Sequence, residues 1–471
     1  MLPLKAKRPK NLVTALSNCL CSAAALFMLF WPSPALSAEA NLQSLTLSDC
    51  IRIAVENATS KIKAENNLKL QGADLLRSYG NFLPTVSSSA SYTPFALSRN
   101  YSSLYGSNLT RIKTDSRSTS ITLTTSLNLF NGFADYAALR SALQREKAAN
   151  LTLDRALQSI AFDVTQAYYQ ALLDRELLDI SRQNLRSAED QLTLTERQYQ
   201  IGLKSLIDRY QQQAEASQSG LVVIKAKTRM EHSMLELLRR LGLEGMSRID
   251  IAPQQKSNET AIAVKINVDS LATMAMERRS DLTSKSLEAS AAKWQITQAR
   301  SAWFPRLDLD FNVGSAATSY LSGSTYAYPT PTISDQLGNS IGYSLTLNLR
   351  WSIFDGFQTS YNVQSAKIAH SNQELDYHDL RDNIKIDLQQ AAGEYSSAGR
   401  QIEAAKVSLT AANAAFDGIK RKYELGAAGF TELSAARAAL FSAQSTLSQA
   451  RWNLALQKSV LDYTTGSLTL P

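Results

Sequence analysis

The sequence contains two copies of one unit. At an offset of 221 residues Pro84 aligns with Pro305, and at an offset of 224 LFNGF (129–133) aligns with IFDGF (353–357). Each copy predicts, in order, a short helical segment, a proline, two alternating strands, an Asn/Asp-Gly turn and a very long helix. Because internal repeats decide how a whole chain folds, we expect two copies of one structural unit that pack as a single body.

The first 40 residues predict an export signal. Four basic residues precede an apolar run of twelve residues, Leu20 to Trp31, and Ala38-Glu39-Ala40 follows as a small-x-small cleavage site. The run is too short to span a bilayer, which takes about 20 apolar residues. We expect the mature chain to begin between residues 39 and 41. Cys50 is its single cysteine, so no intrachain disulfide is expected.

Charge and composition exclude several function classes. Without residues 1–40 the chain has 45 basic and 41 acidic residues, a net charge of +4 against +7 for the whole sequence. This mild excess is spread along helices, whereas nucleic-acid binding needs a clustered basic face, so no nucleic-acid partner is expected. The three histidines lack ligand spacing, and no phosphate loop, nucleophile elbow or metal motif occurs. We expect a protein that is not an enzyme, with no catalytic residues, metal or cofactor.

Four segments alternate apolar and polar residues at the spacing of β-strands. The clearest is 343–353, where Tyr, Leu, Leu, Leu, Trp and Ile alternate with polar residues. Such alternation over about ten residues is typical of a transmembrane strand with one face to lipid and one to a wet lumen, although a soluble sandwich strand has the same pattern. Aromatic residues near the strand ends favour lipid. The predicted strands are about 85–97, 118–130, 307–320 and 341–354.

Alternation also predicts which polar side chains face the lumen. These barrel-lumen candidates either bias the ion preference of a pore or merely keep it wet, and they are Asp308, Asp310, Asn312, Asn348 and Arg350. Polar loops at about 98–118 and 321–339 join the two strands of each pair. Four strands cannot close a barrel, since the smallest single-chain barrels use eight, and open edges in lipid leave backbone groups unpaired. Three chains sharing one barrel of twelve strands would close the edges.

Two long helical hairpins are predicted, one in each copy. No proline occurs in 95–252 or 332–470, and a heptad seam with unbroken 4-3 spacing covers 153–199 and again 377–423. Gly202 and Gly426 follow these seams as helix C-caps. The predicted helices are about 133–199, 206–241, 357–424 and 430–463, and 67 residues of helix extend about 100 Å. The copies then occupy 41–242 and 266–471, with a linker at 243–265 that could pack around the middle of the body.

The whole layout resembles the TolC family of outer-membrane efflux and secretion channels. The resemblance covers nearly all of the mature chain and rests on the duplicated FNGF/FDGF, FLP/FPR and Y-x-x-G junctions in the right order. It implies an α+β membrane protein: a homotrimer with a shared 12-stranded barrel in outer-membrane lipid and an α-helical tunnel across the periplasm. It also implies two partners, a periplasmic adaptor protein and an inner-membrane pump, and export of drugs, metals or proteins.

The resemblance further assigns roles at the hairpin tips. Acidic side chains six residues after each tip glycine would narrow the periplasmic entrance, here Asp208 and Glu432, although acids are also favoured there by the helix dipole. The sequence departs from the family pattern at Ala428 and Ala435, where a basic and an acidic residue are expected, so cation block should be weaker. The expected adaptor-docking residues are Tyr199, Gly202, Lys204, Leu206, Tyr423, Gly426 and Phe430.

Two other functions are considered. A general diffusion porin would not need helices of 67 residues. A trimeric structural or adhesive outer-membrane protein could use the coiled coil as a stalk, but adhesins do not duplicate a strand–helix unit. We therefore expect an exit duct of a tripartite efflux pump or type I secretion system, located in the outer membrane with a periplasmic extension.

Overall fold

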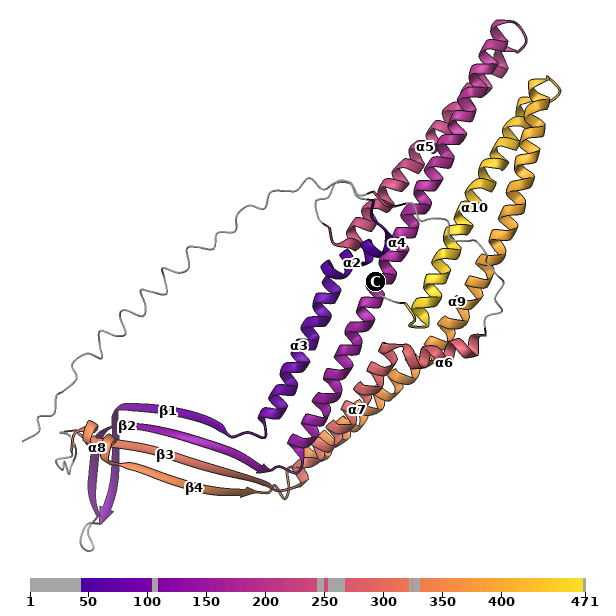
Figure 1. Cartoon of the computed structure of the whole chain (residues 1–471). Helices are drawn as coiled ribbons and strands as arrows, with labels where there is room; N and C mark the ends of the chain where they lie inside the picture. The colour runs from indigo at the N-terminus through magenta and orange to yellow at the C-terminus, as the bar shows by residue number, and fades with distance from the viewer. Residues whose placement is uncertain are drawn as a thin grey trace, which may run out of the picture.

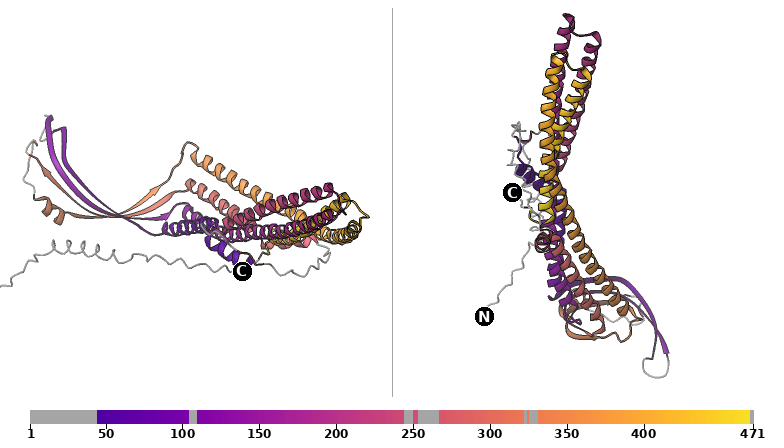
Figure 2. Two further views of the ribbon diagram at one scale, coloured as in Figure 1. Left: turned by 90° about the horizontal axis from the view of Figure 1, so that it is seen from above. Right: turned by 90° about the vertical axis from the view of Figure 1, so that its right-hand side faces the viewer.

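The computed structural model describes residues 44–103, 109–243, 250–252, 267–321, 324 and 331–468. The molecule is elongated, with a sheet at one end and two helical hairpins reaching away at the other (Figure 1). Two further views show the hairpins running side by side along the long axis (Figure 2). The predicted export signal and most of the predicted linker lie outside the described residues.

The two copies follow the same order of elements. The first comprises α2 (Leu47–Asn57), α3 (Thr59–Gly80), β1 (Thr85–Ser103), β2 (Leu109–Phe130), α4 (Ala134–Gln200) and α5 (Leu206–Leu241). The second comprises α6 (Val268–Arg278), α7 (Ser280–Arg300), η1 (Ser301–Trp303), β3 (Arg306–Tyr320), α8 (Ile333–Asn339), β4 (Ile341–Arg350), α9 (Gln358–Glu424) and α10 (Phe430–Thr464). The predicted duplication is thus present in the fold, and α8 is an element that the sequence did not predict.

The four strands form one antiparallel sheet in the order β1-β2-β3-β4. A register shift lies between Thr93 and Ala96, at Pro94, which has no N–H to donate to the ladder. Three predicted bounds were wrong, and the first is the end of β1, which lies at Ser103 rather than near 97. β2 begins at Leu109 rather than near 118, because the polar residues predicted as a loop pair with β1. β4 ends at Arg350 rather than 354, and the aromatic residues after it leave the ladder.

Both long helices have the predicted length of 67 residues. Each begins where the chain takes two consecutive left-handed residues, Gly132-Phe133 before α4 and Gly356-Phe357 before α9. The preceding residue caps the turn. Asn131 Nδ2 donates to Asp135 Oδ2 (2.7 Å), and Asp355 Oδ2 accepts from the Thr359 backbone N–H (2.8 Å). The Asn/Asp-Gly signal in the sequence therefore marks a strand-to-helix junction.

The hydrophobic core lies midway along the molecule, where α2, α4, α5 and α10 meet. It contains seam residues of α4 such as Ile160, Val164 and Ala171, all buried as the heptads predict. The described end of the linker also packs here. Ile251 is fully buried and forms a parallel bridge with Leu45. For residues 250–252, packing at the middle of the body is confirmed.

A buried ion-pair cluster fixes the break between α6 and α7. Arg279, 6% exposed, pairs with Asp281 (Nη2–Oδ2, 2.6 Å), and Arg155 of α4 reaches the same carboxylate (3.4 Å). Burial pushes the pKa of Asp281 up, but the bonds and charges of the two arginines outweigh it and leave the pKa below its ordinary value. The Arg155 guanidinium also stacks on the Tyr463 ring at 3.9 Å, so the cluster ties the second copy to the first.

We predict that Asp281→Asn destabilises the protein by about 2–4 kcal/mol, because it leaves two partly desolvated guanidinium groups without their carboxylate. Asp382→Asn is the matched control, since Asp382 forms exposed pairs on α9 and should cost about 1 kcal/mol or less. Thermal unfolding of the detergent-extracted protein, followed by circular dichroism, measures both. Equal shifts in the two variants would contradict this role for the cluster.

Candidate functional site at the hairpin tips and the sheet

Both hairpin tips use a left-handed glycine to end the outgoing helix. Gly202 and Gly426 have φ of 79° and 76°. The N–H of Leu203 reaches the Gln198 carbonyl (2.8 Å) and that of Ala427 reaches the Lys422 carbonyl (2.8 Å). This pairing, with the glycine just past the helix, is the Schellman motif. The predicted glycine C-caps are therefore confirmed in both copies.

The two return helices begin differently. Ser205 caps α5 in a reciprocal capping box, where Asp208 N–H donates to Ser205 Oγ (3.1 Å) and Asp208 Oδ2 accepts from the Ser205 N–H and hydroxyl (3.1 and 2.8 Å). These bonds hold the pKa of Asp208 below its ordinary value. In α10 the cap is Gly429, which offers no side chain, and the equivalent Glu432 is exposed. Of the two predicted gate acids, Asp208 has a helix-capping role.

A cation–π contact joins the two tips. Lys204 of the first tip lies with its Nζ 4.0 Å from the ring centroid of Tyr423 in the second. Tyr423 is buried at 1% exposure, whereas its repeat partner Tyr199 is 37% exposed. Leu206 is exposed and Phe430 half-buried. The predicted docking residues therefore gather at one end of the molecule, but Tyr423 faces inward.

Four helices bring buried polar groups together near the tips, and sequence reasoning missed this centre. Arg437 of α10 is 4% exposed and Gln212 of α5 is fully buried; Arg437 Nε and Nη1 and both Gln212 amide atoms have no partner among the described atoms. Burial lowers the pKa of Arg437, and Glu215 opposes this. Glu215 accepts from Ser434 (3.1 Å), which links α5 to α10. Extending the heptad count into the return helices could have found Gln212, which lies seven residues before the buried Ser219.

The predicted lumen residues lie on one face of the sheet. Asp310 accepts from Ser126 Oγ of β2 (2.5 Å) and from Asn348 Nδ2 of β4 (2.7 Å), so a polar row crosses three strands. Asn312 accepts from Thr124 (2.8 Å), and Asp308 pairs with Arg306 (2.8 Å). Arg350 stands opposite Arg306 in the ladder.

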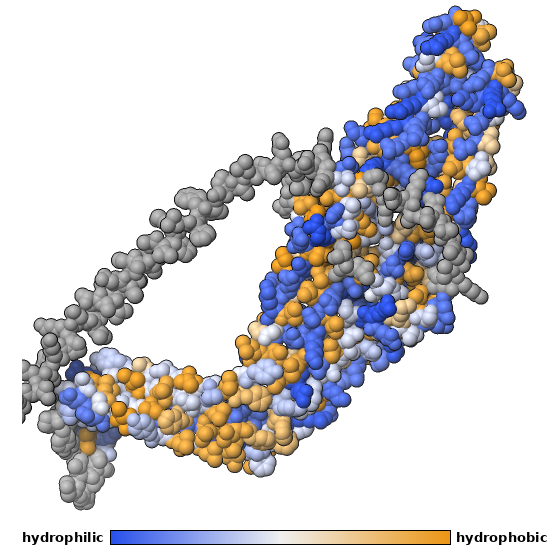
Figure 3. Space-filling view, in the orientation of Figure 1, coloured by the Kyte–Doolittle hydropathy of each residue, from blue (hydrophilic) through white to orange (hydrophobic). Residues whose placement is uncertain are grey.

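The other face of the sheet is apolar and exposed. On β4, Leu345, Leu347 and Leu349 are 60–71% exposed, and Phe311 on β3 lies opposite Leu345. Figure 3 shows the resulting hydrophobic band over the sheet and the more hydrophilic surface of the hairpins. At the helix end of the band, Trp351 Nε1 donates to the Trp303 carbonyl (3.1 Å). One polar face and one apolar face are what a strand between lipid and water needs.

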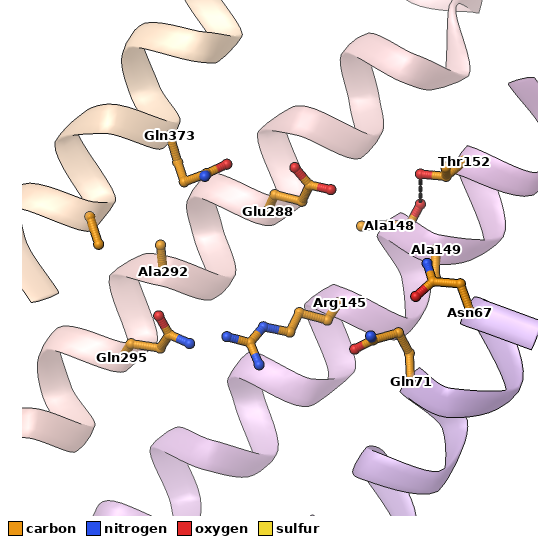
Figure 4. A pocket seen from close by; sticks show the side chains of 11 residues that line it. Asn67, Gln71, Arg145, Ala148, Ala149, Thr152, Glu288, Ala292, Gln295 and Gln373 are labelled. Atoms are coloured by element: carbon orange, nitrogen blue, oxygen red, sulfur yellow. Dashed lines mark hydrogen bonds between the residues drawn. The ribbon is translucent and has the colours of Figure 1, made fainter. Parts of the chain in front are cut away.

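A polar hollow of about 400 Å³ opens between α3, α4, α7 and α9. Arg145, Glu288, Gln295 and Gln373 project around it (Figure 4). Ligand pockets are mostly apolar and enclosed, so this open polar wall is more typical of a wetted surface than of a binding cavity.

Within the described ranges, no group of three or more His, Cys, Asp and Glu is placed to hold a metal ion. The helices in that part of the chain include none long and apolar enough to cross a membrane.

Curated relatives are similar to this sequence over more than half of its length. Protein CyaE of Bordetella pertussis is 25% identical over 419 residues, covering 88% of this chain and 82% of CyaE. The alkaline protease secretion protein AprF of Pseudomonas aeruginosa is 23% identical over 299 residues, and the match spans 63% of this chain and 59% of AprF.

Solved structures share the fold. A crystal structure of CusC superposes with a TM-score of 0.75 at 17% identity, covering 92% of this chain and 95% of CusC. The family model for outer membrane efflux proteins matches residues 63–243 and 271–467, which are most of the two copies of the repeat. The chain therefore belongs to the family of outer membrane efflux proteins, and it is an outer-membrane protein with a periplasmic extension.

Proposed function

We propose that this protein is a trimeric exit duct that passes substrates across the periplasm and the outer membrane, working in a tripartite efflux pump or a type I secretion system. One observation carries the proposal: a sheet with a polar and an apolar face stands on helices of 67 residues, and within the described part of the chain no strand pairs with the outer edge of β1 or of β4. Lipid cannot pair the edge N–H and C=O groups, so further strands must. Three copies supply twelve strands and close a barrel.

The repeat itself supports assembly with further copies of the chain. Gly132, at the β2–α4 junction, packs against the α7–β3 junction so closely that a Cβ there would lie 2.5 Å from the Ser301 carbonyl oxygen. Gly356, its equivalent at the β4–α9 junction, has nothing within 4 Å. The repeat equivalent of the α7–β3 junction is the α3–β1 junction, around Gly80 and Leu83, which lies at the far edge of the sheet. In the proposed trimer the α3–β1 junction of the next copy fills the space at Gly356.

Energy and specificity must then come from partners. We propose that a periplasmic adaptor docks at the hairpin tips, with Leu203 and Leu206 as exposed apolar contacts, and that an inner-membrane pump drives transport. Asp310, Asn312 and Asn348 would line the wet interior of the barrel. The relatives support either type of cargo by their names, since AprF is a protease secretion protein and OpmQ a pyoverdine export protein.

We predict that the protein extracted from outer membranes in mild detergent has the native mass of a trimer, and that Gly356→Ala lowers the trimer fraction. Gly202→Ala is the matched control, because Gly202 also has positive φ with nothing within 4 Å but lies at the tip. Native mass spectrometry measures both. A monomeric wild type would refute the duct, and equal trimer fractions in the two variants would refute the predicted contact at Gly356.

We predict that Glu432→Gln weakens block of the channel by multivalent cations by about tenfold or more, since a ring of three like charges concentrates counter-ions. Asp208→Asn should have a smaller effect on block, because its carboxylate is engaged by Ser205. Conductance of the reconstituted channel in planar bilayers, with the blocking ion added on the hairpin side, gives the two affinities. Equal effects would contradict the idea that the capping bonds hold the Asp208 carboxylate away from the entering ions.

The second candidate is a trimeric structural or adhesive protein with the helices as a stalk. The sequence supports it only through the coiled-coil pattern. A deletion strain distinguishes the two: loss of a duct makes cells hypersensitive to antibiotics and detergents or abolishes a secreted protein. A strain that loses surface attachment alone would favour the adhesin.

A further inference from the structure

The end of the β1–β2 pair farthest from the helical hairpins has its charged side chains on one face only. β3 pairs with β2 only from Ser116 onward, so residues 97–115 extend past the sheet as a two-stranded ribbon, which bends away from the other strands (Figure 1). The charged side chains of this ribbon and of the neighbouring part of β2 all lie on one face. They are Arg99, Arg111, Lys113, Asp115 and Arg117. The opposite face of β2 presents Ile112, Thr114, Ser116 and Ser118.

The charged face continues the apolar face of the sheet. β2 keeps one alternation from Arg111 to Leu123, so Arg117 lies on the same side as the exposed Ile121 and Leu123. Tyr92, opposite Thr119 and 62% exposed, lies between the apolar and the charged residues. Apolar residues, an aromatic residue and then basic residues, met in this order, match the order of acyl chains, interface and headgroups in a bilayer.

The ribbon places like charges close together. Arg99 stands directly opposite Lys113 in the antiparallel pair, and like charges so placed are destabilising. Asp115 is buried and pairs with Lys113 (Nζ–Oδ2, 2.9 Å), so Arg99, Arg111 and Arg117 are the exposed charges of this face. A two-stranded ribbon is also only marginally stable in water by itself. Each feature is relieved if an anion covers this face.

We propose that this face binds the phosphate groups of phosphorylated glycolipid headgroups in the outer leaflet of the outer membrane. Arginine pairs with phosphate through two parallel hydrogen bonds, and clusters of basic residues beside a membrane recognise anionic lipids. The inference rests on the proposed function, because it requires the sheet to cross the membrane with the ribbon on the outer side.

Native mass spectrometry of the full-length trimer tests the proposal, after delipidation and addition of bisphosphorylated lipid A. We expect the wild type to retain it, and Arg99→Gln/Arg117→Gln to weaken retention about 25-fold, or about fivefold for each arginine removed. The control is Arg229→Gln/Arg400→Gln, which removes two exposed arginines of α5 and α9 and should leave retention unchanged. If the double variant does not assemble, the single Arg117→Gln variant replaces it.

Three outcomes would overturn the lipid site: unchanged retention in an intact variant trimer, equal retention of dephosphorylated lipid A, or displacement by millimolar inorganic phosphate. The last would identify a site for free anions instead. A wild type that never forms a trimer would overturn the proposed function, and the lipid site with it.

Discussion

The hydrogen-bonding groups along the outer edges of β1 and β4 are the constraint on which the rest of the molecule depends. In water such edges can bind solvent. The exposed apolar face of the same sheet, however, favours a lipid environment, where each unpaired backbone group costs several kcal/mol. The protomer cannot satisfy them alone. The proposed trimer would pair those edges, and polar side chains such as Asp310 would then lie on the face away from lipid.

The duplication supplies the surfaces for that assembly. Contacts within the chain run from the first copy to the second: α4 packs on α7, and the Gly132 junction closes on Ser301. The return contact, from the second copy to the next first copy, needs another chain. In the proposed ring of three chains, each contact would occur three times. Equivalent residues of the two copies can nevertheless have different surroundings, since Tyr423 is buried and Tyr199 is 37% exposed.

The periodic patterns in the sequence explain how much of the fold could be predicted. The helices of 67 residues, the tip glycines and the sheet faces depend on local patterns, so the sequence located them within a few residues. The start of β2 at Leu109 was missed because charged and uncharged residues alternate in its first half, instead of polar and apolar ones. The buried Arg437 was missed because a single guanidinium among small residues looks like a solvated charge; its burial follows from the crossing of four helices, which no local pattern contains. Likewise, α8 forms where Gln336 bonds both backbone groups of Thr318, a contact between residues 18 apart.

At the first tip, a hydrogen bond within the helix cap lowers the pKa of an acidic side chain. Because Ser205 lowers the pKa of Asp208, the capping bond contributes stability above the ordinary carboxyl pKa of about 4 and loses it only as pH falls through the lowered value. At neutral pH Asp208 is thus ionised but committed to its helix. Glu432 follows a glycine cap and has no such hydroxyl partner at its own N-cap. The two copies therefore differ: Asp208 caps the start of α5, and Glu432 is the acid that we propose to act on ions at the entrance.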